Sequence, residues 1–253
     1  LVLRTERKLN KEILDKVALF CNVDQGAVMQ SVDVTTIYEV PTMMQRQGMD
    51  EVVLKKLNLP YDERPKMEAW NAFLQKRKDA KKVVNIKLVG KYAELPDAYK
   101  SITESLSQVA IYNNRKLVLD LYQSDKINSE NVSELLWKSD GIIVAPGFGQ
   151  RGIEGKFEAL KYARENDIPT FGICLGMQCM VIEYARSVLN LEGANSTEMD
   201  TQAEHKIIDL MEEQKNITNM GASMRLGSYD CNLKKGSLAY KAYGKAKIKE
   251  RHR

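Results

Sequence analysis

Short apolar runs alternate with helical repeats along most of the chain. Apolar runs occupy residues 83–89, 117–122, 141–145 and 168–173, and the first of them ends at Gly90. Between the runs, apolar residues recur at helical spacing over 98–109, 132–137 and 157–164. The run 141–145 has almost no polar residue, which is typical of a strand that is covered on both faces. We therefore predict an α/β fold around an open, mostly parallel, doubly wound sheet.

The first 82 residues read differently. Residues 1–3 resemble a strand entered midway, 12–20 form a short helical or mixed stretch, and 43–59 have amphipathic helical spacing that Gly48 interrupts. Residues 67–74 carry one apolar helical stripe, and the highly charged stretch 75–82 is typical of a solvated helix end. We predict a partial α/β segment over 1–60, a linker helix over 61–82 and the main domain over 83–253.

Composition restricts the class of protein. The 253 residues are 43% hydrophobic and 28% charged, and the net charge of +4 is too small to indicate a nucleic-acid partner. We find neither an apolar run of membrane-spanning length nor a signal-peptide pattern, and we expect no membrane partner. The four cysteines form no C-x-x-C pair and, with two histidines, no plausible zinc set. They are typical of reduced thiols in the cytoplasm.

The stretch 168–178 contains the strongest chemical signal. An apolar run ends in Gly172-Ile173-Cys174-Leu175-Gly176, and helical spacing follows at Met177, Met180, Val181, Tyr184 and Val188. This pattern predicts a strand, a sharp turn and a helix, with Cys174 as a nucleophile at the turn. Glycines are needed on both sides because a Cβ there would clash, and the N–H of Leu175 would face an oxyanion. The alternative is that Cys174 is a small buried core residue.

The segment Cys174-Leu175-Gly176-Met177-Gln178 resembles the nucleophile motif of the class I (triad) glutamine amidotransferases. The resemblance implies a flavodoxin-like fold, L-glutamine as substrate and a triad histidine. It also implies that glutamine is bound by a set of residues around the turn, namely Gly147, Leu175, Gly176, Met177, Gln178 and Glu198.

Two further segments extend this resemblance. Residues 145–149 read Ala-Pro-Gly-Phe-Gly and resemble the family's Pro-Gly-Gly-Phe-Gly oxyanion strand, with Gly147 as the second oxyanion donor. A phosphate-binding loop is the competing interpretation, but its lysine and Ser/Thr are absent. Residues 195–198 resemble the family's Asn-Ser-Thr-Glu segment, in which the glutamate, here Glu198, binds the α-amino group of glutamine. Residues 219–227 resemble the family's Gly-Gly-Thr-Met-Arg-Leu-Gly segment, with Ala222 and Ser223 as departures.

The N-terminal segment resembles the end of the synthetase domain of the CTP synthase family. The resemblance rests on residues 19–23 and on 32–34 followed by Ile37-Tyr38-Glu39-Val40-Pro41. It implies that Lys16 contacts the pyrimidine nucleotide and that Val32, Asp33 and Val34 lie beside the ATP adenine. For Lys16 the alternative is an ordinary solvated lysine. The family further implies ATP and UTP as substrates, CTP as product, Mg as their ion, GTP as effector and a homotetramer.

Two parts of that family's pattern do not occur in the printed sequence. They are the synthetase phosphate loop with most of the UTP site, and the Phe/Tyr-His-Pro-Glu segment with the triad histidine and glutamate. We expect His205 to be a surface residue in a helix-like stretch, and His252 belongs to an Arg-His-Arg motif. We leave the arginine for the glutamine carboxylate unassigned, and we expect the 253-residue chain alone to hydrolyse glutamine poorly.

Two other interpretations remain open at this stage. One is another class I amidotransferase. The segments 20–23 and 38–41 argue against it, because they resemble the synthetase domain of the CTP synthase family. The other is a non-catalytic assembly or regulatory module with the same fold. The basic tail 241–253 could also be read as a nucleic-acid arm, but Glu250-Arg251-His252-Arg253 matches the start of a family motif.

Overall fold

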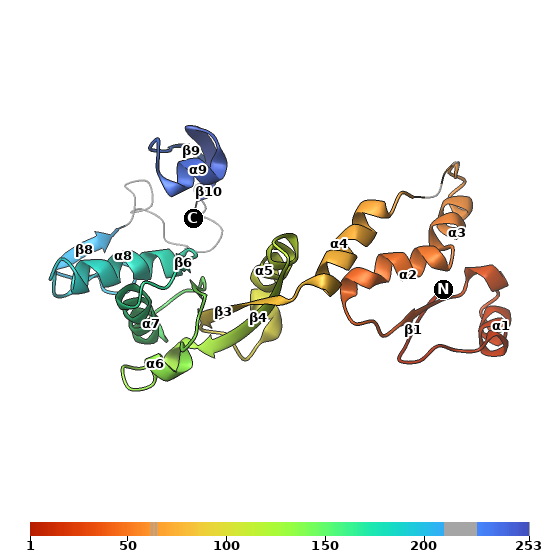
Figure 1. Ribbon diagram of the computed structural model, residues 1–253, viewed down its shortest axis with the longest axis horizontal. Helices are drawn as coiled ribbons and strands as arrows, with labels where there is room; N and C mark the ends of the chain where they lie inside the picture. Colours follow the sequence, from red (N-terminus) through yellow and green to blue (C-terminus); the bar gives the residue numbers. More distant parts are fainter. Residues whose placement is uncertain (62, 64, 210–226, 253) are drawn as a thin grey trace. The chain divides into compact units, whose positions relative to one another are not determined.

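The computed structural model describes residues 1–61, 63, 65–209 and 227–252. Figure 1 labels most of the elements along the chain. The α-helices are α1 (Lys11–Phe20), α2 (Val40–Arg46), α3 (Met49–Lys56), α4 (Glu68–Asp79), α5 (Lys100–Tyr112), α6 (Val132–Leu135), α7 (Ile153–Glu165), α8 (Leu175–Ser187) and α9 (Leu238–Tyr243). The strands are β1 (Val2–Thr5), β2 (Met29–Val32), β3 (Lys82–Gly90), β4 (Arg115–Gln123), β5 (Gly141–Val144), β6 (Thr170–Gly172), β7 (Ala194–Ser196), β8 (His205–Ile208), β9 (Gly227–Asn232) and β10 (Lys247–His252).

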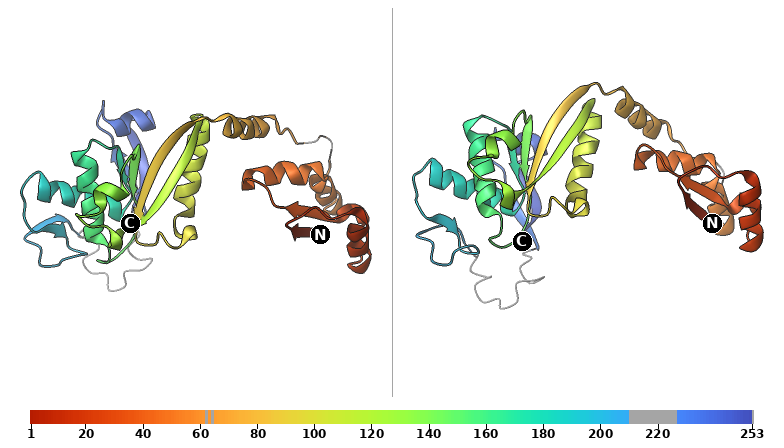
Figure 2. Two further views of the ribbon diagram at one scale, coloured as in Figure 1. Left: turned by 60° about the horizontal axis from the view of Figure 1, so that its bottom comes forward. Right: turned by 90° about the horizontal axis from the view of Figure 1, so that it is seen from below.

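A four-stranded sheet has the order β4-β3-β5-β6, and its strands run side by side in both views of Figure 2. The strands β5 and β6 are parallel, with Val144 opposite Gly172. β5 also runs in the direction of β3, because Asp140 donates to the carbonyl of Asn85 and Ala145 to that of Val89. The predicted doubly wound, mostly parallel sheet is therefore confirmed. In such sheets ligands bind at the carboxyl ends of the strands.

Contacts divide the chain into two compact units. The first comprises Leu1–Lys87, Tyr92–Leu121 and Lys138–Gly141, and the second comprises Leu88–Lys91, Tyr122–Trp137 and Ile142–Arg253. In the first unit β1 and β2 form a parallel pair, and α2 ends before α3 begins because Gly48 adopts a left-handed conformation with φ of 77°. In the second unit β7 and β8 form a parallel pair, and β9 and β10 an antiparallel pair.

The core of the second unit lies between the sheet and the helices α7 and α8. Its buried side chains come from the ends of β3 and β5 and from one face of each helix, and they include Val89, Ile142, Val144, Phe157, Leu160, Ala163, Leu175, Cys179 and Ile182. Phe157, Leu160 and Ala163, which recur at helical spacing within the predicted helix 157–164, are therefore buried. The positions of β5, β6, α7 and α8 follow from this packing, and these elements carry the candidate active site.

Three details differ from the sequence prediction or lie outside it. The stripe that predicted α8 is exposed at Met177, Val181, Tyr184 and Val188, because the helix buries its opposite side, which includes Leu175, Cys179 and Ile182. The helix expected around His205 is wrong: residues 205–208 form β8, and His205 is half-buried because the strand pairs with β7. The motif at 219–227 lies outside the described residues except for Gly227. None of the described helices combines the length and the apolar character needed to cross a bilayer.

Candidate active site

Cys174 occupies the sharp turn between β6 and α8. Its φ of 52° and ψ of −110° are unusual for a residue with a side chain, and such strain is typical of functional turns. The thiol is exposed, and Leu175 begins the helix directly after it. The first N–H groups of a helix have no intrahelical acceptor, so the amide of Leu175 is available to a ligand beside the sulfur. This geometry is that of a nucleophile elbow.

The two glycines beside Cys174 are required by close backbone contacts. A Cβ on Gly172 would lie 2.6 Å from the backbone of Gly176 and 2.6 Å from the nitrogen of Met177. A Cβ on Gly176 would collide with the carbonyl group of Val144, whose carbon would be 2.8 Å away. The steric argument made from the sequence is therefore confirmed by the structure.

The loop after β5 lies against the elbow. A Cβ on Gly147 would be 3.5 Å from the Cδ2 atom of Leu175, so this part of the loop contacts the first residue of α8. Gly147 also approaches the side chain of Lys91, at 3.4 Å from such a Cβ to Cδ. The structure thus brings Gly147 and Leu175, the two predicted oxyanion donors, to the same end of the sheet.

Glu198 follows β7 and joins the same region. The side-chain amide of Gln150, in the loop after β5, donates to the carbonyl of Met199. The N–H of Glu198 is held by the hydroxyl of Ser196 at 3.2 Å, and the Glu198 side chain is exposed. An exposed carboxylate beside the elbow can bind an ammonium group.

Gln178, one turn into α8, carries an unused acceptor. Its Oε1 atom is buried and has no hydrogen-bond partner among the described residues. A buried acceptor without a donor is costly, and such groups in native proteins call for an explanation such as a ligand or an ion. The side chain is therefore available for hydrogen bonds to a bound molecule.

The sequence analysis did not predict two buried lysines that contact the loop after β5. Lys91 is 2% exposed, and Lys156 is completely buried. Burial lowers the pKa of Lys91 and lowers that of Lys156 to about 8, while nearby Cys179 acts in the opposite direction on both. Burial also raises the pKa of Cys179 to about 11, so this thiol, with no exposed surface, is inert in comparison with exposed Cys174.

The residues expected to bind nucleotides lie in the first unit. Lys16 is exposed on α1, and residues 32–34 lie at the end of β2 and in the loop that follows it. The carboxylate of Asp33 forms an ion pair with the exposed guanidinium of Arg4. The structure places Lys16 and residues 32–34 on separate elements.

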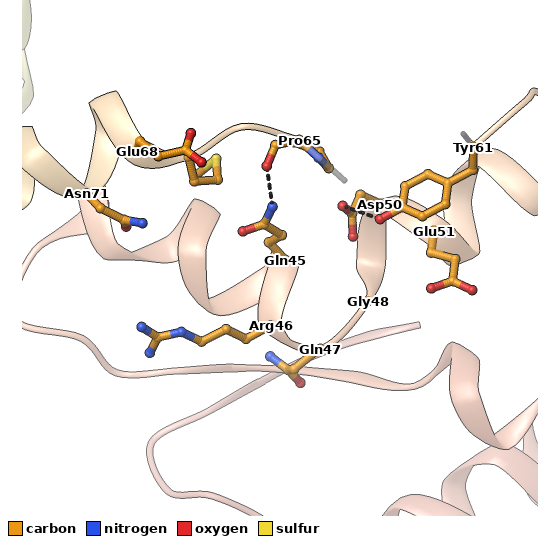
Figure 3. A pocket seen from close by; sticks show the side chains of 11 residues that line it. Gln45, Arg46, Gln47, Gly48, Asp50, Glu51, Tyr61, Pro65, Glu68 and Asn71 are labelled. Carbon is orange, nitrogen blue, oxygen red and sulfur yellow. Dashed lines mark hydrogen bonds between the residues drawn. The ribbon is translucent and has the colours of Figure 1, made fainter. Parts of the chain in front are cut away.

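A cavity of about 580 Å³ also lies in the first unit (Figure 3). Its rim is fixed by two hydrogen bonds, from Gln45 to the carbonyl of Pro65 at 3.0 Å and from Tyr61 to Asp50 at 3.2 Å. None of the candidate nucleotide-binding or catalytic residues lines it. The described residues also contain no group of three or more His, Cys, Asp and Glu side chains that could hold a metal ion. We therefore assign no chemistry to this cavity.

Comparison with known families divides the chain in two. The family model described as glutamine amidotransferase class-I matches residues 94–253, and the one described as CTP synthase N-terminus matches residues 1–59. Residues 145–198, which supply the candidate active site apart from Lys91, lie wholly inside the first of these matches.

Individual proteins give the same result. The CTP synthase of Porphyromonas gingivalis is 61% identical over 253 residues, which are 100% of this chain and 47% of that protein. The CTP synthase of Bacteroides fragilis is 58% identical over 100% of this chain and 48% of its own length. The chain thus spans about half the length of the curated relatives it matches.

Among solved structures, the glutaminase domain of Trypanosoma brucei CTPS with bound acivicin is 35% identical. It superposes with a TM-score of 0.61 over 67% of this chain and 66% of that chain. Together with the two matching models, these similarities show that the chain belongs to the class I glutamine amidotransferases and, within them, to the CTP synthase family.

Proposed function

We propose that Cys174 is the nucleophile of a glutaminase site. The observation that carries the proposal is the strained, exposed elbow at Cys174, between two glycines that admit no side chain. The thiolate attacks the side-chain amide carbon of L-glutamine, and the N–H groups of Gly147 and Leu175 stabilise the oxyanion that forms. The carbon–nitrogen bond then breaks as a general acid, the triad histidine that the family implies, gives a proton to the leaving nitrogen. Ammonia leaves, and water hydrolyses the thioester to glutamate and the free thiol.

Substrate binding is assigned to residues around the elbow. Glu198 binds the α-ammonium group of glutamine, because a carboxylate is the natural partner of an ammonium ion. Gln178 offers its buried, unpaired acceptor to the substrate. The backbone of Gly176 and Met177 completes the pocket. Neither His205 nor His252 is assigned as the acid–base residue.

The ammonia is used by the whole protein, which we propose to be a glutamine-dependent CTP synthase. ATP phosphorylates UTP at position 4 of the pyrimidine, and ammonia displaces the phosphate to give CTP. The match of residues 1–59 to the CTP synthase N-terminus supports this choice over other class I amidotransferases. Lys16 is proposed for the pyrimidine nucleotide, and Val32, Asp33 and Val34 for the ATP adenine.

Further features of the whole protein are proposed from the same family. They are the division into a synthetase part over 1–60, a linker helix over 61–82 and an amidotransferase domain over 83–253, supported by the two model matches. They also include GTP as effector, a homotetramer and a cytoplasmic location. Magnesium accompanies the nucleotides, and we assign it no ligand among the described residues.

The test uses the chain's own cysteines. Cys174 and Cys21 are both exposed, so a small, unselective reagent such as iodoacetamide should label both. A diazo-ketone analogue of glutamine should label Cys174 at least about tenfold faster than Cys21, because only Cys174 has a glutamine pocket and an oxyanion hole. Mass-spectrometric peptide mapping measures both rates. Equal labelling of the two thiols by the analogue, or protection of neither by excess glutamine, would contradict the proposal.

A further inference from the structure

Lys91 and Lys156 have an environment that neither the family matches nor the proposed reaction explains. A buried ammonium ion is costly unless it is paired, and lysine is almost never fully buried without a partner. Here the partners are backbone carbonyls. The Nζ atom of Lys156 donates to the carbonyl of Ala145 at 2.6 Å. The Nζ atom of Lys91 donates to the carbonyl of Phe148 at 2.6 Å and also to that of Gly149.

These three carbonyls lie on both sides of Gly147 in the sequence. A peptide group is planar, so fixing its C=O also fixes the direction of the N–H on the next residue. The carbonyl of Ala145 is held before Gly147, and those of Phe148 and Gly149 are held after it. The peptide between Pro146 and Gly147, which carries the Gly147 N–H, therefore lies between two fixed points.

The alkyl chain of Lys91 also shapes the same place. Both Lys91 and Leu175 line the space beside the Cα of Gly147, at 3.4 Å and 3.5 Å from an ideal Cβ. The backbone of Lys91 is itself held, because Arg151 donates to its carbonyl at 3.0 Å and pairs with Asp125 at 3.2 Å. The side chain of Lys91, the loop 145–149 and the start of α8 therefore meet beside Gly147.

We propose that Lys91 and Lys156 are positioning residues that hold the loop 145–149 so that the N–H of Gly147 faces the oxyanion. This inference rests on the glutaminase function proposed above and adds the reason why the donor is preorganised. An oxyanion donor acts only if it points at the developing charge before the reaction begins. Without the Lys91 ammonium, the carbonyls of Phe148 and Gly149 can turn toward water, and the loop loses its fixed orientation.

The test replaces Lys91 in the full-length gene product. Lys91→Met keeps most of the alkyl chain and removes the charge. We expect kcat for glutamine hydrolysis to fall about 10²-fold with KM little changed, because the lost interaction acts in the transition state. Alkylation of Cys174 by iodoacetamide needs no oxyanion hole, so its rate should stay within about twofold of the wild type.

Two controls separate positioning from folding. Lys87→Met removes a different buried lysine, which lies in β3 and pairs with the carboxylate of Asp120, and should leave kcat unchanged. Cys179 has no exposed surface, so its protection from iodoacetamide reports an intact core. If Lys91→Met loses this protection, Lys156→Met serves in its place, and it should lower kcat with Cys179 protected.

The outcomes are distinct. Normal kcat with protected Cys179, in Lys91→Met or in Lys156→Met where it serves instead, overturns the inference and leaves the proposed function intact. An equal loss of kcat in Lys87→Met also overturns it, because the effect would then be general. A wild-type protein that neither hydrolyses glutamine nor reacts with the diazo-ketone analogue at Cys174 overturns the proposed function itself.

Discussion

Replacing Gly172 by alanine tests the elbow geometry most directly. An added Cβ would lie 2.6 Å from three backbone atoms, the carbonyl carbon and oxygen of Gly176 and the nitrogen of Met177. Ordinary contacts to a Cβ begin at 3.4 Å, so the end of β6 and the first turn of α8 must separate by about 0.8 Å. No flexible side chain can absorb this movement, because all three atoms belong to the helix backbone.

The size of the effect follows from this displacement. Forcing extra atoms into a packed core costs typically about 1–3 kcal/mol, and the close approach to a peptide group of the helix backbone places Gly172→Ala near 3 kcal/mol. The same movement shifts Leu175 and Cys174 relative to Gly147. A misplacement of about 1 Å can cost about 10²-fold in rate, so labelling of Cys174 by the diazo-ketone analogue should slow by a comparable factor.

Two measurements check this prediction. Denaturant titration gives the free energy of unfolding, and peptide mapping gives the labelling rate. Gly26→Ala is the matched control, because a Cβ on Gly26 meets no atom within 4 Å, and it should change both quantities little. If Gly172→Ala unfolds and reacts like Gly26→Ala, the strand and the helix do not pack as closely as the structure indicates.

Three further outcomes are expected. The pKa of Lys156 is lowered to about 8 from 10.5, so the folded chain loses this proton at a lower pH than the unfolded chain does. From pH 8 to 10.5 the free energy of unfolding should therefore rise, relative to that of Lys156→Met, by up to about 3 kcal/mol. Parallel pH curves for the two proteins would contradict this. Arg164→Met leaves the carboxylate of Glu183, which is 5% exposed, without the guanidinium 2.8 Å away. Denaturant titration should show a loss of about 3 kcal/mol in the free energy of unfolding, and the double variant with Glu183→Leu should largely recover it. Glu198→Gln should raise KM for glutamine about tenfold or more with kcat little changed, and an equal effect of Glu192→Gln, another exposed carboxylate, would refute the assignment of the ammonium site.

Much of the sheet and the elbow could be predicted because local signals agree there. The apolar run of β5 is too continuous for a solvated strand, and glycines on both sides of Cys174 have one steric explanation that the structure bears out. Helix α8 was predicted from its repeat, yet its buried face was not. Apolar side chains lie on both sides of that helix, and periodicity alone does not say which side meets the core.

The burial of Lys91 and Lys156 could not be predicted from the sequence, because lysine usually lies at the surface. A signal was present for Lys156, which is four residues before Leu160 and seven before Ala163 and so shares their buried helical face. Lys91 directly follows the strand β3, where a parallel sheet places its ligands. The error at His205 has another cause: four residues are too few to separate a strand from a helix, and the pairing of β8 with β7 decides the outcome.

The difference in exposure between Cys174 and Cys179 affects how the chain responds to oxidants. A sulfenic acid formed on exposed Cys174 is normally rescued when a second thiolate attacks it. Cys179 is only five residues away in the sequence, but it has no exposed surface and its pKa is raised to about 11, so it supplies almost no thiolate. Cys174 therefore has no resolving partner in its own helix. Its repair depends on thiols outside α8, and each lapse in that supply allows irreversible oxidation to the sulfinic acid.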